Sequence, residues 1–343
     1  MKAIDLCCGA GGLTLGLRRA GWDVVLGIDV DATVGETYRS INSESKFLAA
    51  DLRSLPAADI HDAADGLAGP ELLLAGCAPC QTFSKQRRRR GLKTRSDATL
   101  LREFGRLVID LEPAVVLMEN VPGIAAVPGF SSFRRFLKTL REAGYECEYG
   151  VLNARDFGVP QHRRRYVLLA AQDKPVELPS SPMHTISDLE DNTVRSTIER
   201  FPAIDAGETH SSIPNHHAAR LSERNLERMT ATPVDGGSHR DWPQQLRLEC
   251  HMRTDGYSDV YGRMWWDRVA PTLTSRCNSL SNGRFGHPEQ NRAISLREAA
   301  ALQTFSDDCE FFGPKTRIAR WIGNAVPVSF AETLGQAAME AAA

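Results

Sequence analysis

The sequence predicts an α/β fold with a mainly parallel sheet, followed by a second, smaller domain of irregular structure. Residues 1–175 alternate short β-branched or aliphatic runs with helical patterns, which is typical of parallel α/β sheets. After residue 175, proline, serine, threonine, asparagine and histidine become frequent, and helical periodicity fades until about residue 266. We therefore assign residues 1–175 and about 322–343 to one domain. The second domain spans residues 176 to about 321, and its irregular surface suits recognition of a binding partner.

Six strands are expected in the first domain, because short apolar runs are bounded there by turn residues. They are Ala3–Leu6, Val24–Ile28, Leu72–Ala75, Val115–Met118, Cys147–Leu152 and Tyr166–Ala170. Apolar residues spaced three and four apart predict helices in both domains. They are about Leu101–Leu111, Ser131–Ala143, Leu296–Gln303 and Val328–Ala341. Pro113 and Gly144 supply stop signals after the first two of these helices.

The composition is ordinary for a globular protein, with 343 residues of which 42% are hydrophobic and 24% are charged. No apolar run approaches the ~20 residues that a membrane helix needs, and the first residues have no signal-peptide layout. The eight cysteines lack the spacing of a secreted disulfide scaffold, so reduced thiols are expected. These features predict a cytoplasmic protein without a membrane segment.

Positive charge is concentrated in two places, although the formal net charge is −2. Seven cations and no acid lie between Lys85 and Arg95, and a second cluster is Arg163–Arg165. Such clusters suit nucleic-acid phosphates. Taken alone, they fit a solvated charged loop equally well.

A glycine-containing loop follows the first predicted strand. Asp5 lies in that strand, and Cys7–Gly12 lead into a helix, where glycines let the backbone approach a ligand closely. Asp29 ends the second strand, where a carboxylate can accept hydrogen bonds from ribose hydroxyls. The pattern Gly9-x-Gly11-Gly12 has Thr14 where a dinucleotide fingerprint has its third glycine. An adenosyl methyl donor, a dinucleotide and a purely structural turn all remain open on these residues alone.

Cys80 is a candidate nucleophile. It follows the predicted strand Leu72–Ala75, at the sheet edge where such folds bind ligands, and it precedes the basic segment. The spacing Cys77-x-x-Cys80 also fits half of a zinc site or a redox pair. However, no second pair completes four metal ligands, and the redox motif belongs to a much smaller fold. A buried inert thiol is a sound interpretation of Cys77.

Glu119 and two arginines are the candidate partners of this cysteine. Glu119 follows the apolar strand Val115–Met118, which should place its carboxylate beside the Cys80 loop. Arg163 and Arg165 share one face by the two-residue period of a strand, so both guanidiniums can point at one site. A structural carboxylate and a surface ion-pair strand are the alternative interpretations.

In their order and spacing, these motifs resemble those of the cytosine-5 DNA methyltransferases over almost the whole chain. The matching segments are Asp5–Gly12, Asp29, Pro79-Cys80-Gln81, Glu119-Asn120-Val121, Gln161-x-Arg163-x-Arg165, Arg268–Ser275, Arg297–Phe305 and Gly323–Pro327. The sequence departs from the family at Cys7, where a phenylalanine usually packs on the cofactor adenine, and at Ser306, where proline is frequent. The Cys-Phe-Thr marker of the branch that methylates transfer RNA is absent.

The resemblance implies a Rossmann-like, S-adenosylmethionine-dependent methyltransferase fold with a mixed sheet and a smaller target-recognition domain. It implies methyl transfer from S-adenosylmethionine to C5 of a flipped-out cytosine in a specific duplex DNA sequence, through a covalent bond between Cys80 and C6. Glu119, Arg163 and Arg165 complete the implied catalytic set. The implied donor-binding residues are Cys7, Gly9, Ala10, Gly11, Gly12, Asp29, Val30, Asp51, Leu52, Leu100 and Asn324. The implied DNA-binding residues are Ser84, Lys85, Arg87, Arg88, Arg89 and Arg90, and no metal is expected.

Two alternatives stay open: an RNA substrate for the same chemistry, and a catalytically silent nucleic-acid-binding protein of the same fold. A nicotinamide dehydrogenase is disfavoured by the missing third glycine. The length fits a prokaryotic modification enzyme, for which a cognate restriction endonuclease acting on the same sequence is the implied protein partner.

Overall fold

The structure is a computed structural model that describes residues 1–77, 96–125, 127–180, 192–249 and 259–343. The chain divides into two compact units. The first unit comprises residues 1–157, 164–182 and 326–343, and the second comprises residues 158–163 and 183–325.

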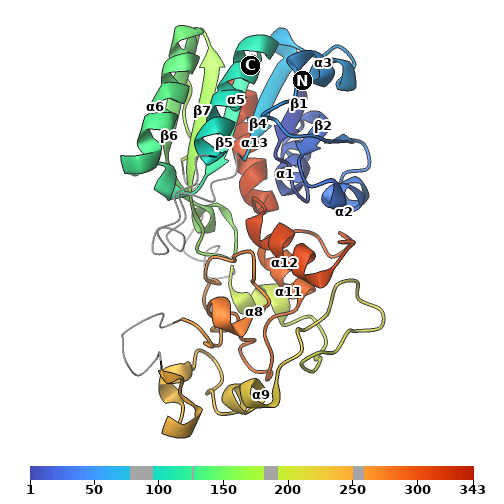
Figure 1. The fold of residues 1–343 in the computed structure, drawn as a ribbon, viewed down its shortest axis with the longest axis vertical. Helices are drawn as coiled ribbons and strands as arrows, with labels where there is room; N and C mark the ends of the chain where they lie inside the picture. Colours follow the sequence, from blue (N-terminus) through green and yellow to red (C-terminus); the bar gives the residue numbers. More distant parts are fainter. Residues whose placement is uncertain (78–95, 126, 181–191, 250–258) are drawn as a thin grey trace. The chain divides into compact units, whose positions relative to one another are not determined.

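A seven-stranded mixed sheet organises the first unit, with the strand order β3-β2-β1-β4-β5-β7-β6 (Figure 1). The strands are β1 Lys2–Leu6, β2 Asp23–Asp29, β3 Lys46–Ala49, β4 Leu72–Gly76, β5 Val115–Asn120, β6 Tyr145–Asn153 and β7 Arg164–Gln172. The first five strands in sequence pair in parallel, and β7 runs antiparallel to both β5 and β6. The α/β fold with a mixed sheet is confirmed, and each of the six predicted strands lies within an observed strand.

Helices cover both faces of this sheet, which explains why its central strands β4 and β5 are buried at every position. The helices of the first unit are α1 Gly12–Arg19, α2 Gly35–Ile41, α3 Ala57–Ala63, α5 Ser96–Leu111, α6 Val127–Glu142 and α13 Val328–Ala342. α5 and α6 pack together over a core that includes Ile4, Leu74 and Phe133, all at most 1% exposed. α1 and α13 pack together and α13 contacts β5 and β7 (Figure 1).

The second unit has little regular structure. Its helices are α8 Val194–Ile198, α9 Glu223–Thr230, α11 Leu296–Leu302 and α12 Lys315–Asn324. α11 confirms the helix predicted near Leu296, whereas α12 was not predicted. No helix among the described residues is long and apolar enough to span a membrane.

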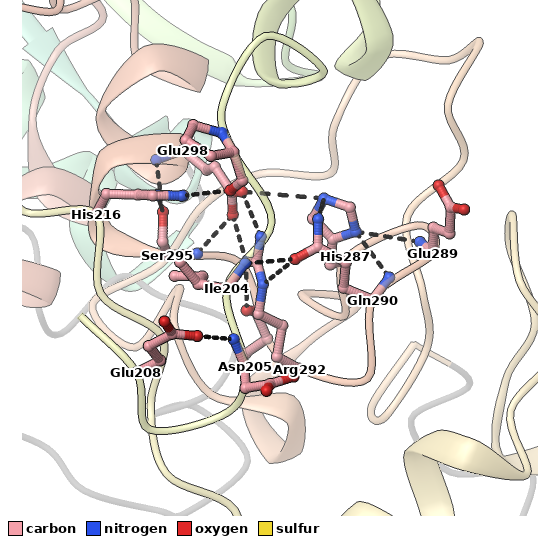
Figure 2. A network of polar contacts seen from close by, with 12 residues as sticks. Ile204, Asp205, Glu208, His216, His287, Glu289, Gln290, Arg292, Ser295 and Glu298 are labelled. Atoms are coloured by element: carbon pink, nitrogen blue, oxygen red, sulfur yellow. Dashed lines mark hydrogen bonds and ion pairs between the residues drawn. The ribbon is translucent and has the colours of Figure 1, made fainter. Parts of the chain in front are cut away.

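Buried charge holds part of the second unit together. Figure 2 shows the Glu298 carboxylate beside Arg292, Ser295 and His287. Arg292 donates two hydrogen bonds to it, of 2.7 and 2.6 Å, and the Ser295 backbone N–H donates a third of 2.7 Å. Burial lowers the pKa of His287 to about 3, so this imidazole is neutral at physiological pH. A buried carboxylate paired in this way fixes the position of the α11 N-terminus.

Glycine permits the close approach of α1 to α13. A Cβ atom at Gly16 would lie 2.5 Å from the Val328 carbonyl oxygen and 2.7 Å from the Glu332 nitrogen. The Trp22 indole N–H, which follows α1, donates a 2.9 Å hydrogen bond to the Gly335 carbonyl. These contacts attach the last helix of the chain to the first.

We predict that Gly16→Leu lowers the free energy of unfolding by about 3 kcal/mol, because the side chain has backbone atoms in its way. Urea unfolding followed by circular dichroism measures the change. Gly105→Ala in α5 is the matched control, since its Cβ would meet Phe136 at an ordinary 3.4 Å. This control should be neutral or more stable by up to about 1 kcal/mol. Equal stability of Gly16→Leu and the wild type would show that α1 and α13 are not closely packed.

Candidate active site

The loop after β1 is built on left-handed backbone conformations. Cys7, Gly9 and Gly11 have φ angles of 60°, 53° and 85°. The loop is tied to β2 by a 3.0 Å hydrogen bond from the Cys8 N–H to the Ile28 carbonyl. No described atom lies within 4 Å of the position that a Gly9 Cβ would occupy. The glycine loop therefore leaves room for a ligand next to its backbone.

Asp29 joins this loop to the end of β2. Its carboxylate accepts a 2.9 Å hydrogen bond from the Gly9 N–H and a 2.8 Å hydrogen bond from the Asp31 N–H. The adjacent Val30 side chain is 66% exposed. An anchored carboxylate beside an exposed apolar side chain suits a ligand with hydroxyls on one part and a flat ring on another.

Asp5 is a fully buried carboxyl group below the loop, and it was not among the predicted binding residues. Thr14 donates a 2.7 Å hydrogen bond to its Oδ2, and the Thr14 hydroxyl is 3.1 Å from that of Tyr38. Its Oδ1 has no hydrogen-bond partner among the described residues. The pKa of Asp5 is raised to about 7, mainly by burial and in part by the negative charge of Asp29, while the Thr14 hydrogen bond acts in the opposite direction. The signal that could have identified it is an acid inside an otherwise apolar strand.

The other predicted donor-binding residues have varied surroundings. Asp51 is paired with Arg53 through hydrogen bonds of 2.9 and 3.0 Å, which hold the pKa of its carboxyl below the usual value. Leu52 is buried and Leu100 is half-buried in the first unit. Asn324 ends α12 in the second unit. Ala10 and Gly12 are buried, and Gly12 begins α1.

β4 and β5 bring Cys77 close to Glu119. The two strands pair in parallel with Gly76 opposite Met118, so the next residue of each strand lies at the same edge. Burial raises the pKa of the Cys77 thiol well above its usual range, and both the charge of Glu119 and a hydrogen bond to that carboxylate add to the effect. Cys80 lies outside the described residues, as do Ser84, Lys85, Arg87, Arg88, Arg89 and Arg90.

Glu119 forms an ion pair with Arg165 of β7. The distance from Glu119 Oε1 to Arg165 Nε is 2.7 Å, and the side chains are 8% and 12% exposed. The N–H is not directed at the oxygen, so Glu119 Oε1 accepts no hydrogen bond from the described residues. A buried carboxylate oxygen that has a cation nearby but accepts no hydrogen bond can accept one from a ligand.

Arg163 and Arg165 belong to different units of the structure. Arg165 lies in β7, which begins at Arg164, and Arg163 precedes that strand. The Arg163 guanidinium is buried in the second unit, where it donates to the carbonyls of Leu273, Gly323 and Ala325 at 3.1, 3.2 and 2.8 Å. These bonds hold the backbone around the end of α12.

Gln161 supports the same region and was predicted only as part of a motif. Its side chain donates a 2.9 Å hydrogen bond to the Gln303 side chain and accepts a 3.0 Å hydrogen bond from the Leu273 N–H. Gln161 and Gln303 are fully buried. Through Gln161, the motif segments Arg268–Ser275 and Arg297–Phe305 meet inside the second unit. Among the residues that the structure describes, no cluster of histidine, cysteine and acidic side chains could hold a metal ion.

Comparison with known proteins agrees with this geometry. Residues 1–340 match the model of the family described as C-5 cytosine-specific DNA methylase. The chain therefore belongs to this family, and it is a DNA (cytosine-5-)-methyltransferase. The Type II methylase M.HgiDII of Herpetosiphon aurantiacus is 39% identical over 97% of this chain and 93% of its own length. The Type II methyltransferase M1.HphI of Haemophilus parahaemolyticus is 33% identical over 98% of this chain and 86% of its own length.

Solved structures share the fold. A protein encoded within an Escherichia coli prophage, described as a DNA modification methyltransferase, superimposes with a TM-score of 0.77 at 24% identity and 99% coverage of both chains. The S. pombe Dnmt2 methyltransferase superimposes with a TM-score of 0.60 at 20% identity, over 99% of this chain and 98% of that one.

We predict that Asp5→Asn changes the pH dependence of stability. Because the folded-state pKa is raised from 3.8 to about 7, stability that is present below pH 3.8 is lost as the pH rises through about 7. The loss amounts to about 1.4 kcal/mol for each unit of raised pKa. Asparagine cannot ionise, so the difference in unfolding free energy between Asp5→Asn and wild type should grow between these pH values and level off above them. Urea unfolding of both proteins at stepped pH measures it, and a pH-independent difference would contradict a raised Asp5 pKa.

Proposed function

We propose that the enzyme transfers a methyl group from S-adenosylmethionine to C5 of a flipped-out cytosine in a specific duplex DNA sequence, through a covalent bond between Cys80 and C6. The observation that carries the proposal is the buried Glu119 carboxylate, paired with Arg165 at the end of β5. Glu119 lies beside the end of β4, and that strand ends four residues before Cys80. A thiol and a carboxylate on neighbouring strand ends suit nucleophilic attack assisted by an acid.

Cytosine C5 is a weak nucleophile, so the reaction needs activation of the ring. The Cys80 thiolate forms a bond to C6, and the ring electrons that this addition displaces make C5 an enamine carbon. Glu119 accepts a hydrogen bond from the 4-amino group and, in its protonated form, donates to N3 and supplies the proton that N3 gains. Arg165 orients the Glu119 carboxylate and stabilises charge on the pyrimidine. C5 gains the methyl group as the methyl–sulfur bond of the donor breaks and its electron pair stays on that sulfur. A base then removes the C5 proton, the S–C6 bond breaks, the thiolate leaves and N3 returns its proton to Glu119.

S-adenosylmethionine supplies an electrophilic methyl group on a positively charged sulfur. The glycine loop and Asp29 fit this donor, because the open backbone at Gly9 can approach it and the Asp29 carboxylate can accept from ribose hydroxyls. Val30 offers an exposed apolar contact for adenine. Cys7, Ala10, Gly11, Gly12, Asp51, Leu52, Leu100 and Asn324 complete the proposed donor site. Asp51 would have to exchange part of its pairing with Arg53 to contact the adenine.

The DNA contacts that we propose come from two parts of the chain. The basic segment with Ser84, Lys85, Arg87, Arg88, Arg89 and Arg90 would bind phosphates around the extruded nucleotide. The second unit would read the sequence, since exposed polar loops suit base edges in the major groove. Arg163 would act there as a positioning residue, because its guanidinium holds backbone carbonyls.

The biological setting that we propose is a type II restriction-modification system. The two relatives described above carry Type II names, and the chain covers 93% and 86% of their lengths. Such a methyltransferase protects a DNA sequence that a cognate restriction endonuclease cleaves, so an endonuclease with the same recognition sequence is the proposed partner.

The main prediction is that Cys80→Ser abolishes methylation while DNA binding persists. Bisulfite sequencing of plasmid DNA from expressing cells should show 5-methylcytosine in one sequence context for wild type and none for the variant. Wild type should also form a denaturation-resistant adduct with a duplex that carries 5-fluorocytosine in that context, because fluorine cannot leave as a proton does. Glu119→Gln should lower kcat by about 10²–10⁴-fold.

Each alternative function gives a different result in this experiment. Tritiated methyl transfer to RNA but not to duplex DNA would favour the RNA substrate. DNA binding by wild type without any methylation would favour the silent binder. Full methylation by Cys80→Ser would refute the covalent step.

A separate prediction concerns the donor. Asp29→Asn should weaken S-adenosylmethionine binding by about tenfold or more, because a charge-assisted hydrogen bond to a ribose hydroxyl is lost. Isothermal titration calorimetry measures the change. Asp31→Asn is the matched control, because the Asp31 side chain caps Thr33 on the exposed surface. Equal weakening by both variants would remove Asp29 from the proposed ribose contact.

A further inference from the structure

Trp265 in the second unit carries two guanidinium groups over its ring. The Cζ atom of Arg284 is 4.2 Å from the ring centroid, and that of Arg268 is 4.5 Å from it. The indole is half-buried and Arg268 is exposed. Both distances are well inside the range of cation–π attraction. Trp265 therefore orients the exposed guanidinium of Arg268.

The indole itself rests on a fixed base. Gly236 has a φ angle of 104°, and any Cβ there would overlap the Trp265 ring. Arg284 is 7% exposed, and its guanidinium donates hydrogen bonds to the carbonyls of Gly236 and Arg263 at 2.8 and 2.9 Å. The backbone, Arg284 and Trp265 thus form a rigid support for Arg268.

The charge of Arg268 is not balanced in the described part of the chain. Its guanidinium makes no hydrogen bond or ion pair with any residue that the structure describes. The neighbouring acids have other partners. Asp267 forms an ion pair with Arg195 at 2.6 Å, and Asp259 forms one with Arg284 at 3.4 Å. Asp235 accepts a 2.7 Å hydrogen bond from the Trp266 N–H.

Arg268 lies near a second cation, Arg284. The pKa of Arg284 is lowered, first by burial and in part by repulsion from Arg268, while Asp259 acts in the opposite direction. A fixed, exposed guanidinium beside a second cation favours an anion or a pair of acceptor atoms.

We infer that Arg268 contacts duplex DNA and donates paired hydrogen bonds to two acceptor atoms. Two phosphate oxygens, or O6 and N7 of a guanine, offer this pair. The inference rests on the proposed function, because it assigns a DNA contact to the unit that we propose reads the sequence. It also gives a role to Arg268 of the motif segment Arg268–Ser275, to which the proposed methyl-transfer mechanism assigns no step.

Arg268→Gln tests the inference. Fluorescence anisotropy would measure binding of a labelled 30-base-pair mixed-sequence duplex, and of a duplex with the methylated context, at several salt concentrations. A phosphate contact predicts weaker binding to both duplexes and a salt slope reduced by about 0.9. A guanine contact predicts a loss of about 5- to 150-fold on the target duplex alone. Unchanged binding to both duplexes would overturn the inference.

Arg200→Gln is the matched control. Arg200 is also exposed and lies 4.6 Å from an aromatic centroid, that of Phe201, but Asp307 neutralises it at 2.8 Å. Its removal should leave both affinities within about twofold, because no unbalanced charge is lost. An equal loss of affinity in Arg200→Gln would overturn the assignment, because removal of any exposed stacked arginine in this unit would then weaken DNA binding.

Trp265→Leu separates orientation from charge. It should weaken DNA binding while the salt slope stays as in wild type, because Arg268 keeps its charge and loses its support. Trp265→Phe should restore most of the affinity. Wild-type affinity in a folded Trp265→Leu, verified by its Tm, would overturn the orienting role. If wild type bound neither duplex, the proposed function would fail as well, which distinguishes that failure from the failure of the inference alone.

Discussion

The parallel pairing of β4 with β5 is the constraint on which the proposed chemistry depends. It sets Gly76 opposite Met118, and so brings Cys77 to the carboxylate of Glu119 at the edge of the sheet. Arg165 reaches the same carboxylate from β7, the strand that pairs with β5 on its other side. Buried ion pairs contribute little net stability because both groups lose hydration, so the value of this pair is positional. The sheet therefore holds a buried carboxylate between Cys77 and Arg165.

Much of the first unit follows from the sequence, because its physical signals are local. Strands such as Val115–Asn120 are buried at every position, since helices cover both faces of the sheet, and their first residues form a continuous apolar run. The short β3 has only four residues, which is too few for a clear periodic signal. α12 has the buried residues Ile318, Ala319, Trp321 and Ile322 at helical spacing, but its last residues were interpreted only as part of a motif. Local patterns were sufficient for every strand of the sheet except the short β3.

Functional geometry was harder to predict, because it depends on partners that are distant in sequence. Gln161 meets Gln303, and Arg163 meets carbonyls more than a hundred residues later. A motif such as Gln161-x-Arg163-x-Arg165 therefore indicates importance without telling which arginine supports the backbone and which pairs with Glu119. The same holds for the whole second unit, where Arg163, Arg263, Arg292 and Arg297 are at most 1% exposed. Backbone carbonyls accept from most of them, and a sequence does not reveal which carbonyls are available.

The placement of α13 has a consequence for synthesis on the ribosome. This helix is made after the whole second unit, yet Val328, Phe330, Ala331 and Leu334 are buried in the first unit. The sheet it contacts is composed of strands from the first half of the chain, so the nascent protein exposes apolar surface on β5 and β7 throughout translation of the second unit. Such exposed surface is where nascent chains aggregate or engage chaperones. The cover of the sheet is therefore completed only after the second unit has been made, and a chain truncated before residue 326 would lack α13.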